Sequence, residues 1–245
     1  MLPKMQSRYG KSSAAYESWG DPLPDSYSYD PEKFFNTGTN VINSISLSTG
    51  NSHNQTYLSA STTNSTGIVP ESKYNRYNFS ARNTTKFAQD KLILDFGVNF
   101  IIQNNHNLVS QGVYNNPIVG LYLFPRGENF DEVRTFERWN DARGIQMQYW
   151  PYGAGAHTIQ NPYWVQNRMD RDMNKRRYMV NASLQYNATD WLNIVGRVRM
   201  DESTTKQNNR FAASTNTTLA GMNGGYRVEA VSYTHLRAHE TLANL

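Results

Sequence analysis

Long stretches of alternating apolar and polar residues, joined in pairs by three-residue turns, constrain this chain more than any other feature. Six successive even-numbered positions from Leu92 to Ile102 are apolar, whereas Asp95, Asn99 and Gln103 lie on the opposite side of the same segment. Alternation with period two puts a different chemistry on each face of an extended strand. The segment therefore predicts a β-strand with an apolar face that is long for a soluble protein.

The clearest pair of strands lies further along the chain. Residues 178–187 alternate, the turn Ala188-Thr189-Asp190 follows, and the alternation resumes through 192–200. Tyr186 and Trp191 lie beside the turn, at one end of the apolar face. Aromatic residues in this position are typical of the girdle that a membrane barrel places at the water boundary.

Two further hairpins follow the same plan. One spans 41–60 around the turn Asn51-Ser52-His53, and the other joins 74–87 to the strand at 92–102 through Ala88-Gln89-Asp90. The connections between hairpins are longer, at 64–73 and 104–175, and always lie at the other end of the strands. Short turns on one side and long loops on the other, with strands of about ten residues, are typical of transmembrane barrels.

These features predict an all-β fold, specifically a partial antiparallel transmembrane β-barrel of about six strands. Residues 1–39 would lead into the strands, 40–226 would form the partial barrel, and 104–175 would be one long extracellular loop. A soluble sandwich would show the same alternation, because period two reports only that the two faces differ. A secreted or surface carbohydrate-binding β-sandwich, an adhesin or lectin, is therefore the alternative.

Composition excludes other classes. The chain has no window of 18 apolar residues, which excludes a helical membrane span, and its mean hydropathy of -0.70 is compatible with a barrel. Cysteine is absent, which excludes disulfides and thiol catalysis. The net charge is +4, and only Lys175-Arg176-Arg177 forms a basic cluster. We interpret this triplet as a solvated strand end, with a phosphate or lipid-headgroup contact as the alternative, and predict no nucleic-acid partner.

Catalytic and metal sites are not indicated. The acidic residues of the long loop and its flank lack the glycine-spaced calcium loop and stand at no triad spacing: Asp131, Glu132, Glu137, Asp170 and Asp172. His235 and His239 stand four apart near Glu240, and we reject a helical zinc site there. We therefore predict that the protein is not an enzyme and that it holds no metal or cofactor.

The long loop has the composition of a binding surface. Flat aromatic rings alternate there with arginine and asparagine, and sugar rings stack on such faces. The alternative is that the rings pack the loop against itself or against a protein partner. The candidate ligand- or partner-binding residues are Trp139, Tyr149, Trp150, Tyr152, Tyr163 and Trp164.

Six short motifs occur in a fixed order along the chain. They are Phe34-Phe35-Asn36-Thr37-Gly38, Thr66-Gly67-Ile68-Val69-Pro70, the segment 116–127 (Asn-Pro-Ile-Val-Gly-Leu-Tyr-Leu-Phe-Pro-Arg-Gly), Gln160-Asn161-Pro162-Tyr163-Trp164, Thr189-Asp190-Trp191-Leu192 and Thr217-Thr218-Leu219-Ala220-Gly221. Together they resemble the SusC/RagA-type TonB-linked outer-membrane proteins of Bacteroidetes. The resemblance runs from about Tyr9 to Tyr226.

This resemblance implies a 22-stranded barrel filled by a plug, of which the chain carries only an early portion. It also implies a location in the cell outer membrane and the import of oligosaccharides or peptides. The implied partners are a SusD-like surface lipoprotein, outer-membrane lipid, and the TonB complex, which would act through the missing plug region. Met1–Arg8 lacks the apolar core of a signal peptide, so we expect the chain to be truncated.

The carboxy-terminal residues 227–245 depart from the resemblance. Val231–Thr241 breaks the barrel pattern and resembles translated sequencing-adapter sequence. We therefore predict that 227–245 is a non-native tail.

Overall fold

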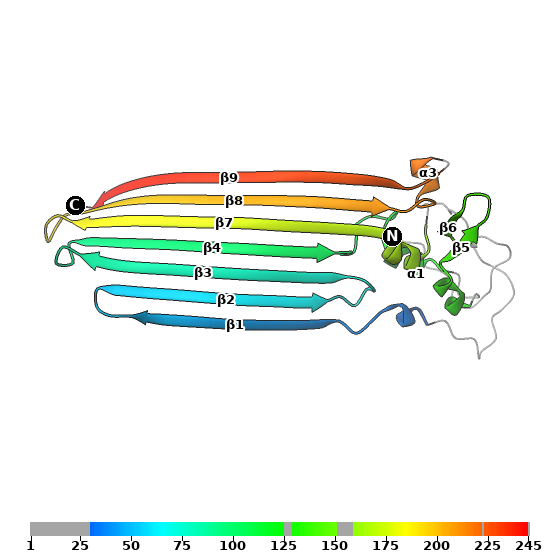
Figure 1. The fold of residues 1–245 in the computed structure, drawn as a ribbon, viewed down its shortest axis with the longest axis horizontal. Coiled ribbons are helices and arrows are strands. Elements are labelled where there is room, and N and C mark those ends of the chain that lie inside the picture. Colours follow the sequence, from blue (N-terminus) through cyan, green and yellow to red (C-terminus); the bar gives the residue numbers. More distant parts are fainter. Residues whose placement is uncertain (1–29, 125–128, 151–158, 222, 245) are drawn as a thin grey trace.

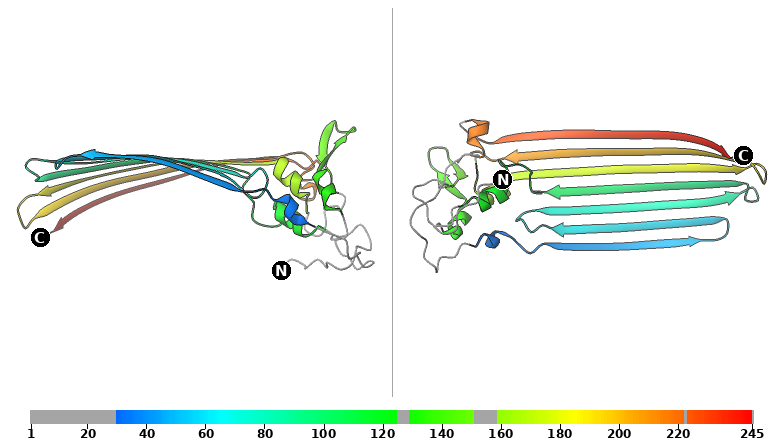
Figure 2. Two further views of the ribbon diagram at one scale, coloured as in Figure 1. Left: turned by 90° about the horizontal axis from the view of Figure 1, so that it is seen from below. Right: turned by 180° about the vertical axis from the view of Figure 1, so that it is seen from behind.

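The computed structural model describes residues 30–124, 129–150, 159–221 and 223–244. Its main feature is a seven-stranded antiparallel sheet with the order β1-β2-β3-β4-β7-β8-β9. Figures 1 and 2 show this sheet as one curved layer, with the helices and the small β5-β6 sheet gathered at one end. The sheet does not close on itself, so the described residues form an open segment of antiparallel wall.

The elements have the following bounds. The large sheet comprises β1 (Thr39–Gly50), β2 (Asn54–Thr66), β3 (Lys73–Phe87), β4 (Leu92–His106), β7 (Met169–Asn187), β8 (Asn193–Phe211) and β9 (Tyr226–Asn244). The small sheet pairs β5 (Glu137–Asn140) with β6 (Ile145–Gln148). The short helices are η1 (Pro31–Phe34), α1 (Pro117–Tyr122), η2 (Phe130–Arg134), α2 (Pro162–Asn167) and α3 (Thr217–Ala220).

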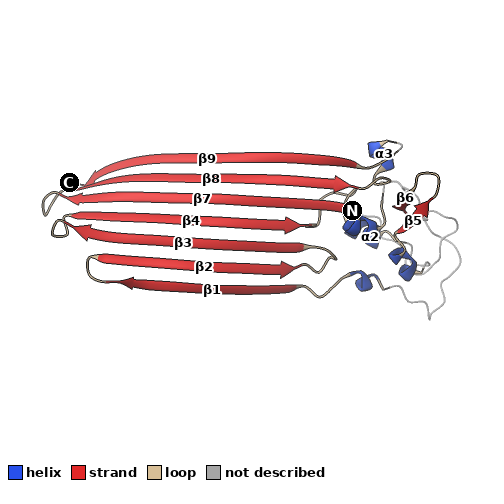
Figure 3. Ribbon diagram, viewed as in Figure 1, coloured by secondary structure: helices blue, strands red, loops and turns tan. Residues whose placement is uncertain are grey.

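The three predicted turns are confirmed, and Figure 3 shows them at the end of the sheet opposite the helices. In the turn between β3 and β4, Ala88, Gln89 and Asp90 have φ angles of 53°, 57° and 65°. Three successive left-handed residues reverse the chain within a few ångströms. The strands on either side consequently meet in register, with Phe87 opposite Leu92.

The strands are longer and more numerous than predicted. We predicted about six strands, and the large sheet has seven. β7 begins at Met169 rather than near Tyr178, and β8 continues to Phe211. The long loop is correspondingly shorter, between His106 and Met169. The apolar pattern missed these extensions because backbone hydrogen bonds between strands do not depend on apolar side chains.

The carboxy-terminal segment is also a strand, contrary to the predicted break in the pattern. β9 pairs with β8 along its whole length, from Phe211 opposite Tyr226 to Asn193 opposite Asn244. An exposed sheet edge offers hydrogen-bond donors and acceptors to any extended segment. Pairing therefore gives no information on whether 227–245 is native, and that part of the prediction stays a prediction.

The buried core lies beside the large sheet rather than within it. Of the buried hydrophobic residues described, Met169 alone belongs to that sheet, at the very start of β7. The others come from what we call the loop module, which consists of 107–168, the segment around η1, the β2–β3 connection and the β8–β9 connection. The chain thus combines an unburied sheet with a compact module at one end.

Candidate functional site

One face of the large sheet carries apolar residues on every strand from β1 to β8, continuously on β4 and mixed with threonine and asparagine on β2 and β3, and we call it the outer face. The register aligns apolar residues across strands, as in the row Leu47, Leu58, Ala81, Val98, Val180 and Met200. The neighbouring row stacks Phe100 on Tyr178, with ring centroids 4.7 Å apart. Phe79, Phe96 and Leu184 are about half exposed, at 52%, 43% and 46%. A soluble protein rarely exposes so large an apolar surface without a function for it.

The apolar belt on β4 can be compared in height with the apolar band of transmembrane barrels. On β4 the outer face is apolar from Leu92 to Ile102. Ten residue steps of roughly 3.4 Å give a belt of roughly 34 Å along the strand. A strand tilted by about 45° would then span roughly 24 Å, close to the apolar band of about 25 Å on transmembrane barrels. On β4 the outer face is therefore apolar over about the height of the apolar band of a transmembrane barrel.

The opposite face, which we call the inner face, is polar. Arg82 donates through Nε to Asp95 at 2.9 Å, and Thr84 donates its hydroxyl proton to the same carboxylate at 2.7 Å. On the neighbouring strands Arg177 pairs with Asp201 at 2.8 Å and 2.5 Å. On β1, β2 and β3 the inner face carries serine residues, including Ser46, Ser59 and Ser80. Such a surface suits water and hydrophilic solutes.

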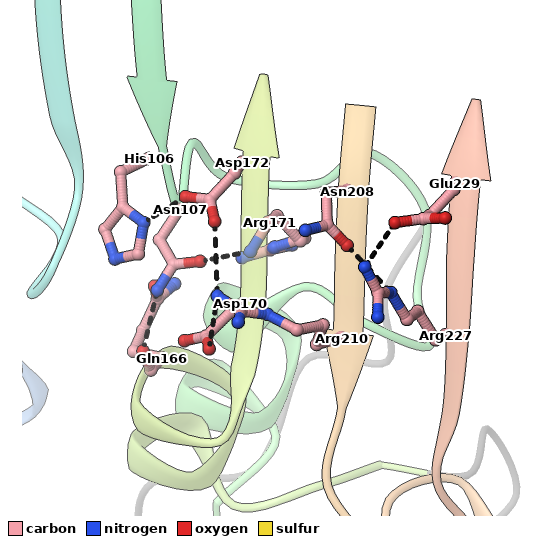
Figure 4. Close-up of polar contacts among 10 residues, drawn as sticks. All are labelled: His106, Asn107, Gln166, Asp170, Arg171, Asp172, Asn208, Arg210, Arg227 and Glu229. Atoms are coloured by element: carbon pink, nitrogen blue, oxygen red, sulfur yellow. Dashed lines mark hydrogen bonds and ion pairs between the residues drawn. The ribbon is translucent and has the colours of Figure 1, made fainter. Parts of the chain in front are cut away.

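Charged groups continue the outer face beyond the apolar belt, next to the loop module. Figure 4 shows His106 of β4 and Asp172 of β7 in contact, at 2.7 Å. Arg210 of β8 bridges Asp170 and Asp172 at 3.3 Å and 3.4 Å. In the same figure Arg227 donates to Asn208, at 3.2 Å, and to Glu229. These pairs link four neighbouring strands above the belt.

The loop module has its own hydrophobic core, built from segments far apart in the sequence. Phe34, Val69, Leu121, Phe124, Phe130 and Val133 form one buried cluster. Trp164, Val165 and Met169 form another, where α2 leads into β7. The Trp164 side chain is completely buried, and its indole N–H donates to the Thr215 hydroxyl at 2.8 Å. The β8–β9 connection is thereby attached to α2.

A network of amide side chains holds the same connections together. The Gln160 amide group donates to the Asn216 side chain at 2.7 Å and to the backbone carbonyl of Tyr114 at 2.8 Å. Asn216 in turn donates to the Asn115 side chain at 2.5 Å. Gln148 accepts from the backbone N–H of Asn161 at 2.8 Å. Because buried amides are costly unless paired, this network specifies one arrangement of the module.

Two sequence motifs are explained by helix capping. In Asn116-Pro117 and Asn161-Pro162 the asparagine is the N-cap and the proline is the first helical residue. The Asn116 and Asn161 side chains accept from Ile118 N–H at 3.0 Å and from Tyr163 N–H at 2.9 Å. Asparagine is a favoured N-cap, and proline fits the first helical position. This capping signal lies within two of the six motifs that carry the family resemblance.

The six candidate aromatic residues do not form one platform. Trp164 is buried, Trp150 packs against the core near Phe124, and Tyr163 contacts the Phe34 ring edge-to-face at 5.1 Å. Burial raises the pKa of Tyr163, although nearby Arg134 opposes this shift. These three rings hold positions typical of structural residues.

The remaining candidates are placed differently. The Arg138 guanidinium lies 3.4 Å above the Tyr149 ring centroid, and Trp139 is 58% exposed on β5. Tyr152 lies outside the described residues. Among the described candidates, Trp139 therefore has the geometry of a ligand or partner contact, and that role stays a prediction.

Four of the acidic residues of the loop and its flank form ordinary ion pairs, namely Asp131, Glu137, Asp170 and Asp172. Besides the contacts of Asp170 and Asp172, Glu137 accepts two hydrogen bonds from Arg168, at 2.6 Å and 2.8 Å. This contact raises the pKa of the Arg168 guanidinium. Across the described part of the chain, no group of three or more His, Asp or Glu side chains has a metal-binding arrangement.

Within the described residues no helix is long and apolar enough to cross a membrane. The exposed apolar side chains of the large sheet include Phe79, Phe96 and Leu184 on its outer face. Fold and surface together define an open segment of an antiparallel β-barrel wall, with a structured module on its long-connection side.

Comparison with known proteins supports this class. No protein-family model and no curated protein sequence matches the chain. Solved structures do: it is similar to the RagAB peptide importer in the closed-closed state, with a TM-score of 0.66, 17% identity and 89% of this chain covered. For the open-open state these values are 0.62, 18% and 87%. For a structure of the RagAB peptide transporter they are 0.60, 16% and 83%.

The likeness concerns the fold. This chain spans 22% to 23% of the length of the chains that it matches. The fold predicted from the resemblance to SusC/RagA-type proteins, a partial and open antiparallel β-barrel, is confirmed.

Proposed function

We propose that this chain is a wall segment of an outer-membrane TonB-dependent importer. In this role the apolar belt contacts membrane lipid, the inner face lines the lumen, and the loop module faces the outside of the cell. The complete importer would take up peptides or oligosaccharides with a SusD-like lipoprotein, driven by the TonB complex through a plug. The segment itself would have no enzymatic activity.

The observation that carries this proposal is the two-faced sheet. Along β4 its outer face is apolar over about the height of the apolar band of a transmembrane barrel, and its inner face carries paired and unpaired charges. A carbohydrate-binding sandwich would instead pack the apolar residues against a second sheet. Among the described residues the other sheet is the two-stranded β5-β6 hairpin, which belongs to the loop module. The barrel segment therefore accounts for the exposure of Phe79 and Phe96, and the sandwich does not.

For the cargo, peptides are favoured over oligosaccharides, because the matched structures are those of a peptide importer and a peptide transporter. Trp139 is the residue of the loop module that we propose for partner or ligand contact. A hot-spot aromatic ring at such a contact contributes on the order of 1–3 kcal/mol to binding.

The test uses the complete transporter that contains this chain, expressed in a Gram-negative host. We expect it in the outer-membrane fraction, and we expect added protease to cleave the loop module in intact cells. Recovery of the complete protein as a soluble monomer without detergent would overturn the proposal.

A pair of tryptophan variants tests the contact role. Trp139→Ala should weaken binding of the lipoprotein or of a peptide by about tenfold. Trp191→Ala is the matched control, because Trp191 is 67% exposed but lies at the short-turn end of the sheet. Equal binding by both variants and the wild type would show that Trp139 is not a contact residue.

A further inference from the structure

The inner face carries far more positive than negative charge. Over strands β1–β4, β7 and β8, eight basic residues point to this side and two acidic ones, Asp95 and Asp201. The basic residues are Arg76, Arg82, Lys86, Arg171, Lys175, Arg177, Arg197 and Arg199. The outer face of the same strands is nearly balanced, with Lys73, Arg176, Lys206 and Arg210 against Asp170, Asp172 and Glu202. The imbalance is therefore a property of one face.

Arg171 binds the Ser110 hydroxyl and the Asn115 carbonyl of the loop module, and most of the remaining inner charge forms no ion pair within the described residues. Arg82 and Arg177 are paired with the two aspartates. Lys175, Arg197 and Arg199 form no contact ion pair with any side chain that the structure describes, although Lys175 and Arg199 attract Asp201 at longer range, and both arginines are exposed. Like charges on one wall repel each other and cost stability. Their presence suggests a ligand of opposite charge.

Lys175, Arg197 and Arg199 lie in line with the Arg177–Asp201 ion pair along β7 and β8. We define the basic strip as Lys175 and Arg177 of β7 with Arg197 and Arg199 of β8. Lys175 lies opposite Thr205, which is eight positions from Arg197 on β8, so the strip extends roughly 27 Å along the strands. An extended peptide of about eight residues has the same length.

The strip also offers hydrogen-bonding groups between its charges. The register places Asn181 opposite Arg199 and Ser183 opposite Arg197 on the same face. Guanidinium groups bind carboxylates through two parallel hydrogen bonds, which gives orientation as well as attraction. Rings of basic side chains likewise select anions in pores.

We propose that the basic strip binds the carboxylate side chains of acidic peptides as they pass along the lumen wall. This inference rests on the proposed function, which makes the inner face the lumen, and it narrows the cargo from peptides in general to acidic peptides. It also gives the triplet Lys175-Arg176-Arg177 a division of roles. Lys175 and Arg177 face the lumen, whereas Arg176 lies on the outer face.

The experiment measures fluorescence anisotropy of two labelled hexapeptides on the purified complete transporter in detergent. One peptide alternates glutamate and serine, and the other replaces each glutamate by the nearly isosteric glutamine. The test variant is Arg197→Gln with Arg199→Gln. The control, Arg176→Gln with Lys206→Gln, removes the same charge from exposed residues on the outer face of the same two strands.

We expect the wild type and the control to bind the glutamate peptide more tightly than the glutamine peptide. The test variant should lose roughly tenfold in affinity for the glutamate peptide, since each exposed ion pair contributes a factor of about two to five. Its affinity for the glutamine peptide should not change. Raising the salt from about 0.05 M to about 0.5 M should abolish the preference.

Each other outcome has a distinct meaning. Equal binding of both peptides by the wild type overturns the acidic-cargo inference and leaves a peptide importer standing. A test variant that loses both peptides equally, or unfolds at lower temperature than the control, shows that the strip contacts another segment of the transporter, which also overturns it. Binding of neither peptide by any variant argues against peptide import itself, and thus against the proposed function.

Discussion

The sheet and the loop module are stabilised in opposite ways. The sheet has long strands in continuous register, and Met169 is its one fully buried hydrophobic residue among those described. The loop module has short helices and little regular pairing, yet it contains the other buried hydrophobic residues. The sheet therefore depends on backbone hydrogen bonds and on the medium around it, whereas the module depends on side-chain packing. Mutations should separate these two sources of stability.

The largest effect is expected at the core of the loop module. Trp164→Ala removes a completely buried indole and its hydrogen bond to Thr215. We expect the module to lose about 3–5 kcal/mol of stability, as for other large-to-small core changes. Limited proteolysis of the complete transporter measures this as cleavage between His106 and Met169 at lower temperature. Trp139→Ala, at an exposed ring, is the control, and equal cleavage of the two variants would contradict the buried position of Trp164.

The next largest effect should separate the two faces of the sheet. Val180→Arg puts a charge in the middle of the apolar belt, whereas Asn181→Arg puts it on the inner face one residue later. The first change should cost about 2–4 kcal/mol, as for arginine at the bilayer midplane, and the second should cost less, mainly through repulsion from Arg199 opposite it. Urea unfolding in phospholipid vesicles measures both. If Asn181→Arg were the more harmful change, the assignment of outer and inner faces would be reversed.

A smaller effect is expected where the loop module packs backbone against backbone. A Cβ atom at Gly120 would lie 2.5 Å from the backbone oxygen of Gln160, which cannot move aside easily. Gly120→Ala should therefore cost about 1–3 kcal/mol through overpacking. Gly196→Ala is the control in the sheet, because a Cβ atom there meets nothing within 4 Å. Thermal unfolding midpoints of the two variants test the difference, and equal midpoints would exclude close packing at Gly120.

The smallest effect is expected at a helix terminus. Asn116→Ala removes the oxygen that accepts from Ile118 N–H at the start of α1, and should cost about 1 kcal/mol. Asn116→Asp keeps an acceptor oxygen and should retain most of the stability. Protection of the α1 amides from hydrogen exchange is the measurement. Unchanged protection in Asn116→Ala would show that core packing alone holds α1 in place.

Much of the sheet could be predicted from the sequence, because its signal is local. The turns at Ala88-Gln89-Asp90 and Ala188-Thr189-Asp190 and the alternation along β4 required only neighbouring residues. The ends of β7 and β8 could not be predicted in this way. There the outer-face residues are polar, as at Asp170, Asp172 and Arg210, and the strands continue because of pairing across the sheet.

The candidate binding residues show more clearly that local sequence does not predict which side chains are buried. Aromatic content marked the long loop as a candidate binding surface, but it did not distinguish the buried Trp164 from the exposed Trp139. That distinction depends on Thr215 and Phe211, which are distant in sequence from the loop. The basic strip could likewise not be predicted from the sequence, because Lys175 and Arg177 lie far in sequence from Arg197 and Arg199.

The sequence by itself determined that the chain forms two-faced strands in hairpins, since a period of two and a tight turn are properties of adjacent residues. Only the tertiary structure decided which loop residues are buried and which charges share a face. The physical reason is that burial and electrostatic potential depend on the summed positions of residues from several strands. The register of β7 against β8 sets those positions, and this register cannot be predicted from either strand alone.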